Sequence, residues 1–287
     1  GRPAGDAPRT PLRARRTDGL SSLYDVCYTV QQNGAWTPWV RNDEGTAGQE
    51  GSGLKITGIR MTIVTKGSAI PGEKAAVQGI DPNRPMIALT FDDGPHAPVT
   101  NRILDSLEAN GGRATFFMVG NRVTGKANKA AVARMAALGC EVANHTYEHK
   151  AITKLGAEGI KSQLARANDS IRLAGGVSPV LMRPPGGAKS DAAMKTVGSM
   201  GMSAVLWSID TLDWKTKNKQ KTIDAVIGHV KDGDIVLMHD LYGTTADAAE
   251  VIIPKLKEME FQLVTVSELA SYRGGIQPGK VYSRFRP

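Results

Sequence analysis

Residues 86–96 read MIALTFDDGPH, an apolar run of strand length that ends in two adjacent aspartates, Asp92 and Asp93. Six more apolar runs of four to seven residues follow: ATFFMV, CEVAN, VLMR, SAVLWSI, DIVLM and QLVTV. Strands with apolar residues on both faces are typical of a parallel sheet whose two faces are covered. The run from Met86 therefore predicts the first strand of such a sheet.

Helical periodicity lies between these runs. The apolar residues that recur at helical spacing are Val99, Ile103 and Leu107, then Ile160, Leu164 and Ile171 with slips, and later Val251 with Leu256. Alternating strands and helices over about 190 residues predict an α/β fold, a distorted (β/α) barrel of about seven parallel strands. A doubly wound open sheet is the alternative on pattern alone.

A different pattern precedes the barrel. Short alternating runs, LYDVCYTV, WTPWV and LKITGIRMTIV, are separated by turn-forming stretches that include Asn33-Gly34. They predict a small all-β N-terminal module at residues 23–66. The other predicted segments are a flexible basic leader at 1–22, a linker at 67–83, the barrel domain at 84–275 and a C-terminal tail at 276–287.

The chain carries a formal net charge of +8, from 36 basic and 28 acidic residues. Nucleic acid, anionic lipid and acidic cell wall are polyanions that this charge favours. The basic residues form no stripe interleaved with aromatic residues, so we expect no nucleic-acid partner. No run of about 18 apolar residues occurs, so we expect no membrane span. Cys27 and Cys140 lie far apart in the sequence, and we expect two free thiols.

Polar residues break the apolar pattern almost entirely at the ends of the predicted strands. They lie at residues 90–96, 144–149, 183–187, 210–214 and 239–240. The carboxyl ends of parallel strands open on one face of a barrel. We therefore expect these five loops to surround one pocket.

His145 and His149 are four residues apart, which on a helical turn places both imidazoles on one side to bind a divalent metal. Two ordinary surface histidines are the alternative. Asp92 and Asp93 favour a metal, because two neighbouring carboxylates after a buried strand repel each other unless a cation or an arginine offsets them. One aspartate with two histidines forms a facial triad with open positions for water and substrate, and the other aspartate is then available as a base.

Arg183 is the natural partner for that second aspartate, with an ordinary surface cation as the alternative. His239 ends an apolar strand, where a core histidine is the usual explanation, but a bond to Asp213 would favour the protonated imidazole and make it a general acid. Trp214 is either core filler or a wall on which a sugar ring stacks. The glycines at 186–187 are either a turn or a bare backbone whose N–H approaches a developing oxyanion.

At these residues the chain resembles the polysaccharide deacetylase family, the metal-dependent carbohydrate esterases that share the NodB homology domain. The likeness covers about residues 84–272, with five family motifs in order: TFDDGP at 90–95, HTYEH at 145–149, RPPGG at 183–187, DTLDW at 210–214 and IVLMHD at 235–240. The family fold is a distorted (β/α) barrel. The resemblance implies these roles: Asp92 as the catalytic base, Asp93, His145 and His149 as the metal ligands, Arg183 as the residue that aligns Asp92, and His239 as the acid tuned by Asp213.

A tyrosine usually follows the two prolines in this family, and here that residue is Gly186. The resemblance places its backbone N–H in the oxyanion hole, a role that glycine retains while the pocket wall changes. We expect Pro185, Gly186 and Trp214 to contact the substrate.

Residues 27 to about 64 resemble a single, degenerate ChW repeat, a tryptophan-bearing module of surface proteins in clostridia and their relatives. The matching stretches are YTVQQNGAWTPWV, DEGTAGQEGSG and LKITGIRMTI. The resemblance implies export from a Gram-positive bacterium. Trp36 or Trp39 would pack the module, which a small β unit favours, or meet a wall ligand.

The resemblance implies hydrolysis of N-acetyl groups on an aminosugar polymer, with peptidoglycan N-acetylglucosamine as the first choice. Chitooligosaccharides and acetylated xylan are the alternatives, as is a catalytically inactive scaffold that binds glycan or metal. One divalent ion is expected, zinc by default, with cobalt, nickel, manganese or iron also suited to such a site. We expect a monomer that is secreted or attached to the cell surface. The start at Gly1, without a charged-then-apolar leader, suggests that upstream sequence is missing and does not indicate a cytoplasmic protein.

Overall fold

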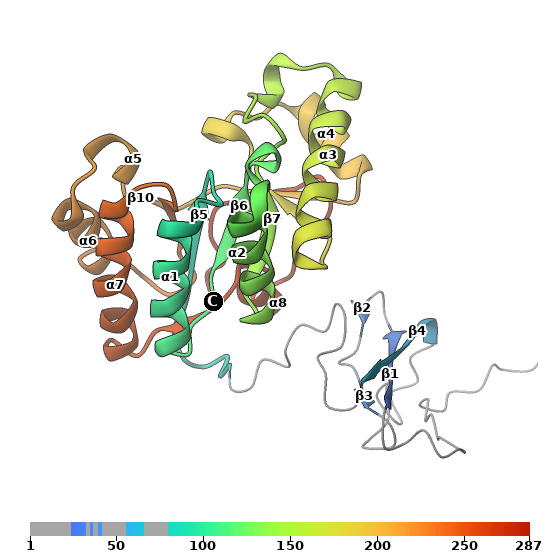
Figure 1. Cartoon of the computed structure of the whole chain (residues 1–287), viewed down its shortest axis with the longest axis horizontal. Helices are drawn as coiled ribbons and strands as arrows, with labels where there is room; N and C mark the ends of the chain where they lie inside the picture. Colours follow the sequence, from blue (N-terminus) through green and yellow to red (C-terminus); the bar gives the residue numbers. More distant parts are fainter. Residues whose placement is uncertain (1–23, 33–34, 37–39, 42–55, 66–79) are drawn as a thin grey trace, which may run out of the picture. The chain divides into compact units, whose positions relative to one another are not determined.

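The computed structural model describes residues 24–32, 35–36, 40–41, 56–65 and 80–287 (Figure 1). Two compact units make up the chain, Gly1–Gln78 and Gly79–Pro287. None of the helices in the described part of the chain combines the length and the hydropathy that a membrane span requires. Cys27 and Cys140 are both buried, and Cys140 is a free thiol.

The described part of the first unit is an antiparallel sheet. Its strands are β1 (Tyr24–Gln32), β2 (Ala35–Trp36), β3 (Val40–Arg41) and β4 (Ile56–Thr65). β1 pairs with each of the other three, and its Tyr28 and Val30 are buried together. The predicted all-β character of this region is confirmed, whereas its identity as a ChW repeat stays a prediction. The side chain of Trp36, all of Trp39, the leader and linker residues 67–79 lie outside the described residues.

The second unit is built around one curled parallel sheet. Within residues 80–287 its strands are β5 (Met86–Asp92), β6 (Thr115–Met118), β7 (Glu141–Asn144), β8 (Leu181–Met182), β9 (Ser203–Val205), β10 (Ile209–Asp210), β11 (Ile235–His239), β12 (Gln262–Leu263) and β13 (Val281–Tyr282). Their order is β10-β11-β5-β6-β7-β8-β9-β13, with β12 paired to β5, and each of these pairings is parallel. The predicted α/β fold, a distorted (β/α) barrel of parallel strands, is confirmed.

Most of the helices cover the outer side of this sheet. Within residues 80–287 the α-helices are α1 (Ala97–Ala109), α2 (Gly125–Ala137), α3 (Ala157–Gly175), α4 (Asp191–Ser199), α5 (Asp213–Thr216), α6 (Lys219–Ile227), α7 (Gly243–Glu258) and α8 (Val266–Ser271), and the 3₁₀ turns are η2 (Gly120–Arg122), η3 (Ile152–Lys154) and η4 (Pro185–Gly187). Neighbouring helices follow the order α6, α7, α1, α2, α3, α4 around the sheet (Figure 1). The predicted row of Val99, Ile103 and Leu107 is the buried face of α1.

Alternate residues of β5 face two different cores. The odd-numbered residues 87, 89 and 91 belong to the outer core beneath the helices, whereas Met86 and Ala88 belong to an inner core that α8 helps to fill. Because successive side chains of a strand point to opposite faces, Thr90 and Asp92 continue the inner row toward the carboxyl end. Both are buried. The first polar motif therefore enters the barrel interior.

The barrel is open between its two edge strands, β10 and β13. The run SAVLWSI, predicted as one strand, is divided into β9 and β10 by residues 206–208. Leu206 donates its N–H to the Tyr282 carbonyl on β13 (2.7 Å), whereas Ser208 donates its N–H to the Ile235 carbonyl on β11 (3.0 Å). The chain thus crosses from one edge of the sheet to the other within these residues.

Residues 276–287 are not the tail that the sequence predicts. β13 pairs with β9, and Phe285 is 5% exposed and stacks on Tyr282 with ring centroids 5.1 Å apart. A strand of two residues is too short to produce a periodic pattern, and glycine and proline precede it. The segment is part of the sheet and of the inner core.

Candidate active site

The five polar loops follow β5, β7, β8, β10 and β11 at the carboxyl ends of the parallel strands. Three groups of side chains form there: Asp93 with His145 and His149, Asp92 with Arg183, and His239 with Asp213. His145 lies 3.7 Å from Asp92, and His239 is the ladder partner of Asp92 across β5 and β11. All three groups therefore belong to one end of the barrel.

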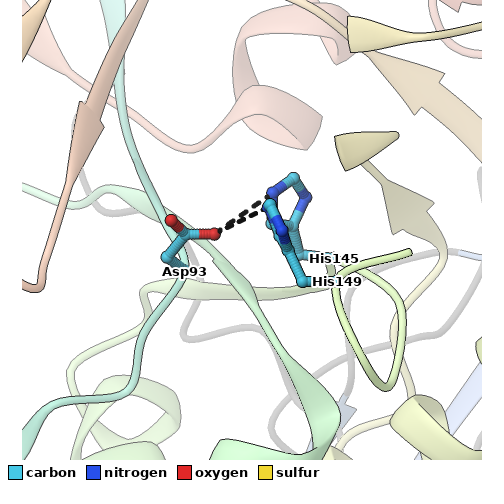
Figure 2. A group of neighbouring side chains, drawn as sticks. All are labelled: Asp93, His145 and His149. Carbon is cyan, nitrogen blue, oxygen red and sulfur yellow. Dashed lines mark ion pairs between the residues drawn. The ribbon is translucent and has the colours of Figure 1, made fainter. Parts of the chain in front are cut away.

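Asp93 and the two histidines have donor atoms that all lie within 4.8 Å of one another. Figure 2 shows one carboxylate oxygen of Asp93 directed at both imidazoles. This Oδ1 is 3.5 Å from His145 Nε2 and 3.1 Å from His149 Nε2. The sequence pattern allows either aspartate to be the third member of the triad, whereas the geometry groups Asp93 with both histidines.

The two histidines meet through an irregular loop rather than the predicted helical turn. Residues 145–149 contain no helix, and Thr146 and His149 have φ values of 63° and 56°. Asn144 Oδ1 accepts the N–H of Thr146 (2.7 Å), and Gln163 Oε1 accepts the next two backbone N–H groups (3.1 and 2.9 Å). Side-chain acceptors, not helical carbonyls, bond this backbone. The prediction of a helical turn is wrong, although it placed the correct pair of residues together.

His145 presents a lone pair to the triad. Its Nδ1 lies 2.7 Å from the carbonyl oxygen of Arg183, which only accepts, so we assign the proton to Nδ1 and leave Nε2 unprotonated in the neutral ring. Burial lowers the pKa of His145 and favours this neutral form, although the charges of Asp92 and Asp93 oppose the shift.

The donor set fits a divalent cation. Asp93 Oδ1 is buried and has no hydrogen-bond partner among the described residues. Burial opposes ionisation of Asp93, yet the interactions with His149 and the other nearby histidines lower its pKa to about 2. A carboxylate oxygen and an imidazole lone pair 3.5 Å apart repel each other unless a cation lies between them. Two imidazole nitrogens and one carboxylate oxygen are ligands that zinc and related metals accept.

Arg183 is completely buried beneath Asp92. Its Nη1 donates to Asp92 Oδ1 (2.6 Å) and to Thr90 Oγ1 (2.8 Å). Nε and Nη2 donate to the carbonyl oxygens of Val205 and Leu206, each at 3.0 Å. Burial lowers the pKa of Arg183 while Asp92 opposes the shift, and a guanidinium in a protein stays charged. The surface-cation alternative is therefore wrong, and one oxygen of Asp92 is held in a fixed direction.

His239 and Asp213 form the second oriented pair. His239 Nδ1 lies 2.8 Å from Asp213 Oδ1, and the carboxylate is 1% exposed. The other oxygen, Oδ2, accepts the His239 backbone N–H (2.8 Å) and the Thr245 hydroxyl (2.7 Å). Burial lowers the pKa of His239, but the hydrogen bond and charge of Asp213 outweigh it, so the pKa is raised. With Nδ1 engaged, Nε2 is the ring atom available to a substrate.

The residues expected to contact substrate differ in exposure. Pro185 is buried, whereas Gly186 is exposed with φ of 64°. A Cβ on Gly186 would meet no other atom within 4 Å. Trp214, on α5, is 45% exposed, which argues against its being core filler.

A family model described as polysaccharide deacetylase matches residues 79–205. The peptidoglycan-N-acetylglucosamine deacetylase of Bacillus cereus is 36% identical over 196 residues, which cover 67% of this chain and 91% of that relative. The chain belongs to the polysaccharide deacetylase family. The family resemblance predicted from the five motifs is confirmed.

Two further relatives of this family member have solved structures. The peptidoglycan-N-acetylmuramic acid deacetylase PdaC of Bacillus subtilis is 43% identical over 190 residues, 66% of this chain and 40% of that relative. Its structure has a TM-score of 0.63 and is matched over 67% of this chain and 93% of that one. A family 4 acetyl xylan esterase from Clostridium thermocellum, solved with a cobalt ion, is 31% identical with a TM-score of 0.65, over 70% of this chain and 100% of that one. The chain spans 40% to 41% of the length of the first curated relatives that it matches.

The candidate site of this family member also includes residues that the sequence analysis does not single out. Thr90 and Phe117 contact Arg183. Arg122 donates to the Asp93 carbonyl (2.7 Å), and Thr245 donates its hydroxyl to Asp213. Tyr242 lies beside His239, with ring centroids 6.4 Å apart. The two-residue period of a strand places Thr90 on the same face as Asp92, so the sequence pattern could have indicated Thr90 as a site residue. Contacts made by Arg122 and Thr245 depend on how helices pack, which the local pattern does not contain.

Proposed function

We propose that the domain at 79–287 removes N-acetyl groups from an aminosugar polymer by metal-assisted hydrolysis. The proposal is carried by the meeting of one metal-ligand set with two oriented acid–base pairs at one end of the barrel. Amide hydrolysis requires a polarised carbonyl, a base for the attacking water and an acid for the leaving nitrogen. Each group in the site supplies one of these functions.

Asp93, His145 and His149 would hold the divalent ion, for which zinc is our first choice. When bound, such an ion polarises a carbonyl oxygen and lowers the pKa of water. The cobalt ion of the Clostridium thermocellum relative supports a divalent-metal site here. The hydrogen bond from His145 Nδ1 to the Arg183 carbonyl would fix the orientation of that ring.

Asp92 is the proposed base. Arg183 engages Oδ1, so Oδ2, which lies 3.7 Å from His145 Nε2, is the oxygen that faces the metal ligands. A water molecule attacking the acetyl carbonyl would give its proton to this oxygen. The buried guanidinium holds the carboxylate in one direction throughout.

His239 is the proposed acid. Asp213 favours the protonated imidazole and holds it by Nδ1, so Nε2 donates its proton to the sugar nitrogen as the carbon–nitrogen bond breaks. An amine leaves poorly until it is protonated, so this step is required for turnover. The backbone N–H of the exposed Gly186 would donate to the developing oxyanion, and Trp214 would stack on a sugar ring.

Peptidoglycan N-acetylglucosamine is the proposed substrate. The name of the Bacillus cereus relative supports it, as does the net charge of +8, which favours an acidic cell wall. The second candidate is peptidoglycan N-acetylmuramic acid, which is favoured by the 43% identity to the Bacillus subtilis relative. Chitooligosaccharides and acetylated xylan remain alternatives for the same catalytic residues. A wall substrate implies a secreted or surface-attached enzyme, in our proposal that of a Gram-positive bacterium.

The test is acetate release from purified peptidoglycan and from chitopentaose, each with added zinc or cobalt and with chelator. Acid hydrolysis of the treated wall, after chemical tagging of free amines, then separates tagged glucosamine from tagged muramic acid. We expect chelator-sensitive release from peptidoglycan with the tag on glucosamine. A tag on muramic acid would select the second candidate, and release from chitopentaose alone would select chitin fragments. Release from neither substrate would contradict the proposed activity.

A further inference from the structure

The loop that presents Asp93 has an unusual backbone, with φ of 73° at Asp93 itself. Three hydrogen bonds hold it. Asp93 donates its N–H to the Phe117 carbonyl (3.1 Å), and the Asp93 carbonyl accepts from Arg122 Nη1 (2.7 Å). The Gly94 carbonyl accepts the Val119 N–H (3.0 Å). These bonds restrain the peptide groups, and a different residue covers the Cα of Gly94.

That residue is Asp240, which directly follows His239 and is fully buried. A Cβ on Gly94 would lie 2.2 Å from both carboxylate oxygens of Asp240, so only glycine leaves room for this carboxyl group. The backbone N–H of Asp240 also donates to the Asp92 carbonyl (3.3 Å). Asp240 thus contacts the residues on either side of Asp93.

A third contact ties Asp240 to helix α1. Its Oδ2 accepts the hydroxyl of Thr100 at 2.5 Å, and the same hydroxyl oxygen accepts the His96 N–H at 3.0 Å. The other oxygen, Oδ1, is buried without a hydrogen-bond partner among the described residues. Burying a half-satisfied carboxyl group costs stability, which argues that its position serves a purpose other than stability alone.

We propose that Asp240 is a positioning residue for the metal site. Held by Thr100 and packed against Gly94, its carboxyl group sets the turn on which Asp93 presents its oxygen and joins that turn to the loop of His239. The inference rests on the proposed metal site. Mutation of a group that orients a metal ligand without touching the metal typically lowers metal affinity by about 10- to 100-fold.

The experiment compares Asp240→Ala with Asp240→Asn in the full chain. The readouts are Zn²⁺ affinity, from competition with a chromophoric chelator, and the visible absorption spectrum of the Co²⁺-loaded protein. We expect Asp240→Ala to bind Zn²⁺ about 10-fold or more weakly and to change the Co²⁺ spectrum. Asp240→Asn keeps the volume and an acceptor for Thr100, so its Zn²⁺ affinity should stay within about 3-fold of the unaltered chain.

Glu268→Ala is the matched control, because it also removes a buried carboxyl group. Glu268 completes the capping box of α8 and pairs with Arg113 (3.0 Å), which precedes β6 at the opposite end of the barrel. This variant should lower the melting temperature of the metal-free protein and leave Zn²⁺ affinity unchanged. Thr100→Val, which removes only the hydroxyl group, provides a second test should Asp240→Ala fail to fold, and we expect about a 3-fold or larger loss of Zn²⁺ affinity.

An unchanged Zn²⁺ affinity and Co²⁺ spectrum in Asp240→Ala would overturn the inference, and so would unchanged affinity in Thr100→Val. Equal losses of Zn²⁺ affinity in Asp240→Ala and Asp240→Asn would also overturn the inference. The charge of Asp240, rather than its shape and its acceptor for Thr100, would then be responsible for the loss. If the unaltered chain binds neither Zn²⁺ nor Co²⁺, the proposed metal site fails and the inference fails with it.

Discussion

Asp92 and Asp93 are chain neighbours with different partners. Asp92 ends a regular strand and meets the buried guanidinium of Arg183, whereas Asp93 turns into the left-handed region and meets two histidines. Adjacent residues in an extended strand would face opposite sides of the sheet. The positive φ of Asp93 is therefore what lets both carboxylates serve one pocket.

This division predicts different losses for two matched variants. Asp92→Ala should lower kcat by about 10²- to 10⁴-fold, the usual contribution of a general base, and leave Zn²⁺ bound. Asp93→Ala should release Zn²⁺ because it removes a ligand. Acetate-release kinetics and equilibrium dialysis would measure both effects. Near-normal activity of Asp92→Ala would contradict its role as the base.

The raised pKa of His239 predicts the alkaline limb of the pH–rate profile. A proton donor must be protonated, so kcat should fall as the pH rises through the raised pKa of His239. In Asp213→Asn the charge that raises this pKa is lost and burial lowers it, so the limb should move about one pH unit or more toward acid. The control is Asp210→Asn, a carboxylate of the same motif that accepts the Leu212 N–H (2.9 Å). A limb that stays in place in Asp213→Asn would exclude His239 as its source.

At the residue scale the motif residues were predictable because each follows a recognisable apolar run. Which aspartate joins the histidines was not, because that choice depends on the backbone angle of Asp93. The complete burial of Arg183 was also not predictable, since a charged residue after a strand usually lies at the surface. The close contact between Asp240 and Gly94 joins residues that are far apart in the sequence, and no local sequence pattern indicates such a contact.

At the scale of elements, strands of two residues account for the errors in the predicted sheet. The sequence pattern predicts one strand where β9 and β10 lie, and a tail where β13 lies, because neither β10 nor β13 is long enough to show alternation. The long helices were predictable, as the buried row of α1 shows. The spacing of the histidines predicts a helical turn at 145–149, because spacing alone does not distinguish helical carbonyls from the side-chain acceptors Asn144 and Gln163.

The packing of the C-terminal segment gives a stability prediction. Phe285→Ala should lower the free energy of unfolding by about 3 kcal/mol, because it empties a buried aromatic site. For a domain of this size that corresponds to a fall of roughly 6–12 °C in Tm. Leu173→Ala, at a side chain 76% exposed on α3, should change the free energy of unfolding by less than about 0.5 kcal/mol. Equal melting temperatures for the two variants would show that 276–287 does not stabilise the domain.

At the scale of the whole molecule, metal binding should couple activity to stability. Removing the ion with a chelator should abolish acetate release, and added zinc or cobalt should restore it. Free Zn²⁺ at 100 times its Kd should add about 2.7 kcal/mol to the free energy of unfolding, visible as a higher Tm. His145→Ala should lose both responses. Activity that persists through exhaustive chelation would contradict a metal-dependent mechanism.

The architecture as a whole was the most predictable level. Alternating apolar runs and helical periods indicate a parallel sheet, and the rule that strand ends share one face predicts the meeting of the five loops. The division of the run 203–209 into two strands at the open seam was not predictable, because Leu206 hydrogen-bonds to β13 whereas Ser208 hydrogen-bonds to β11. The division into two compact units follows the composition change before Pro85.

Because Arg183 is buried in the barrel, the catalytic site cannot be transferred to another protein scaffold by moving its loops alone. In a regular barrel the interior is filled by layers of apolar side chains, but here a guanidinium occupies that space and donates to the backbone carbonyls of Val205, at the end of β9, and of Leu206, which follows it. Grafting the five surface loops onto another scaffold would leave this cation without its acceptors. A mutant library that seeks new glycan specificity should therefore hold the barrel interior constant and diversify the exposed positions, Gly186 and Trp214 first.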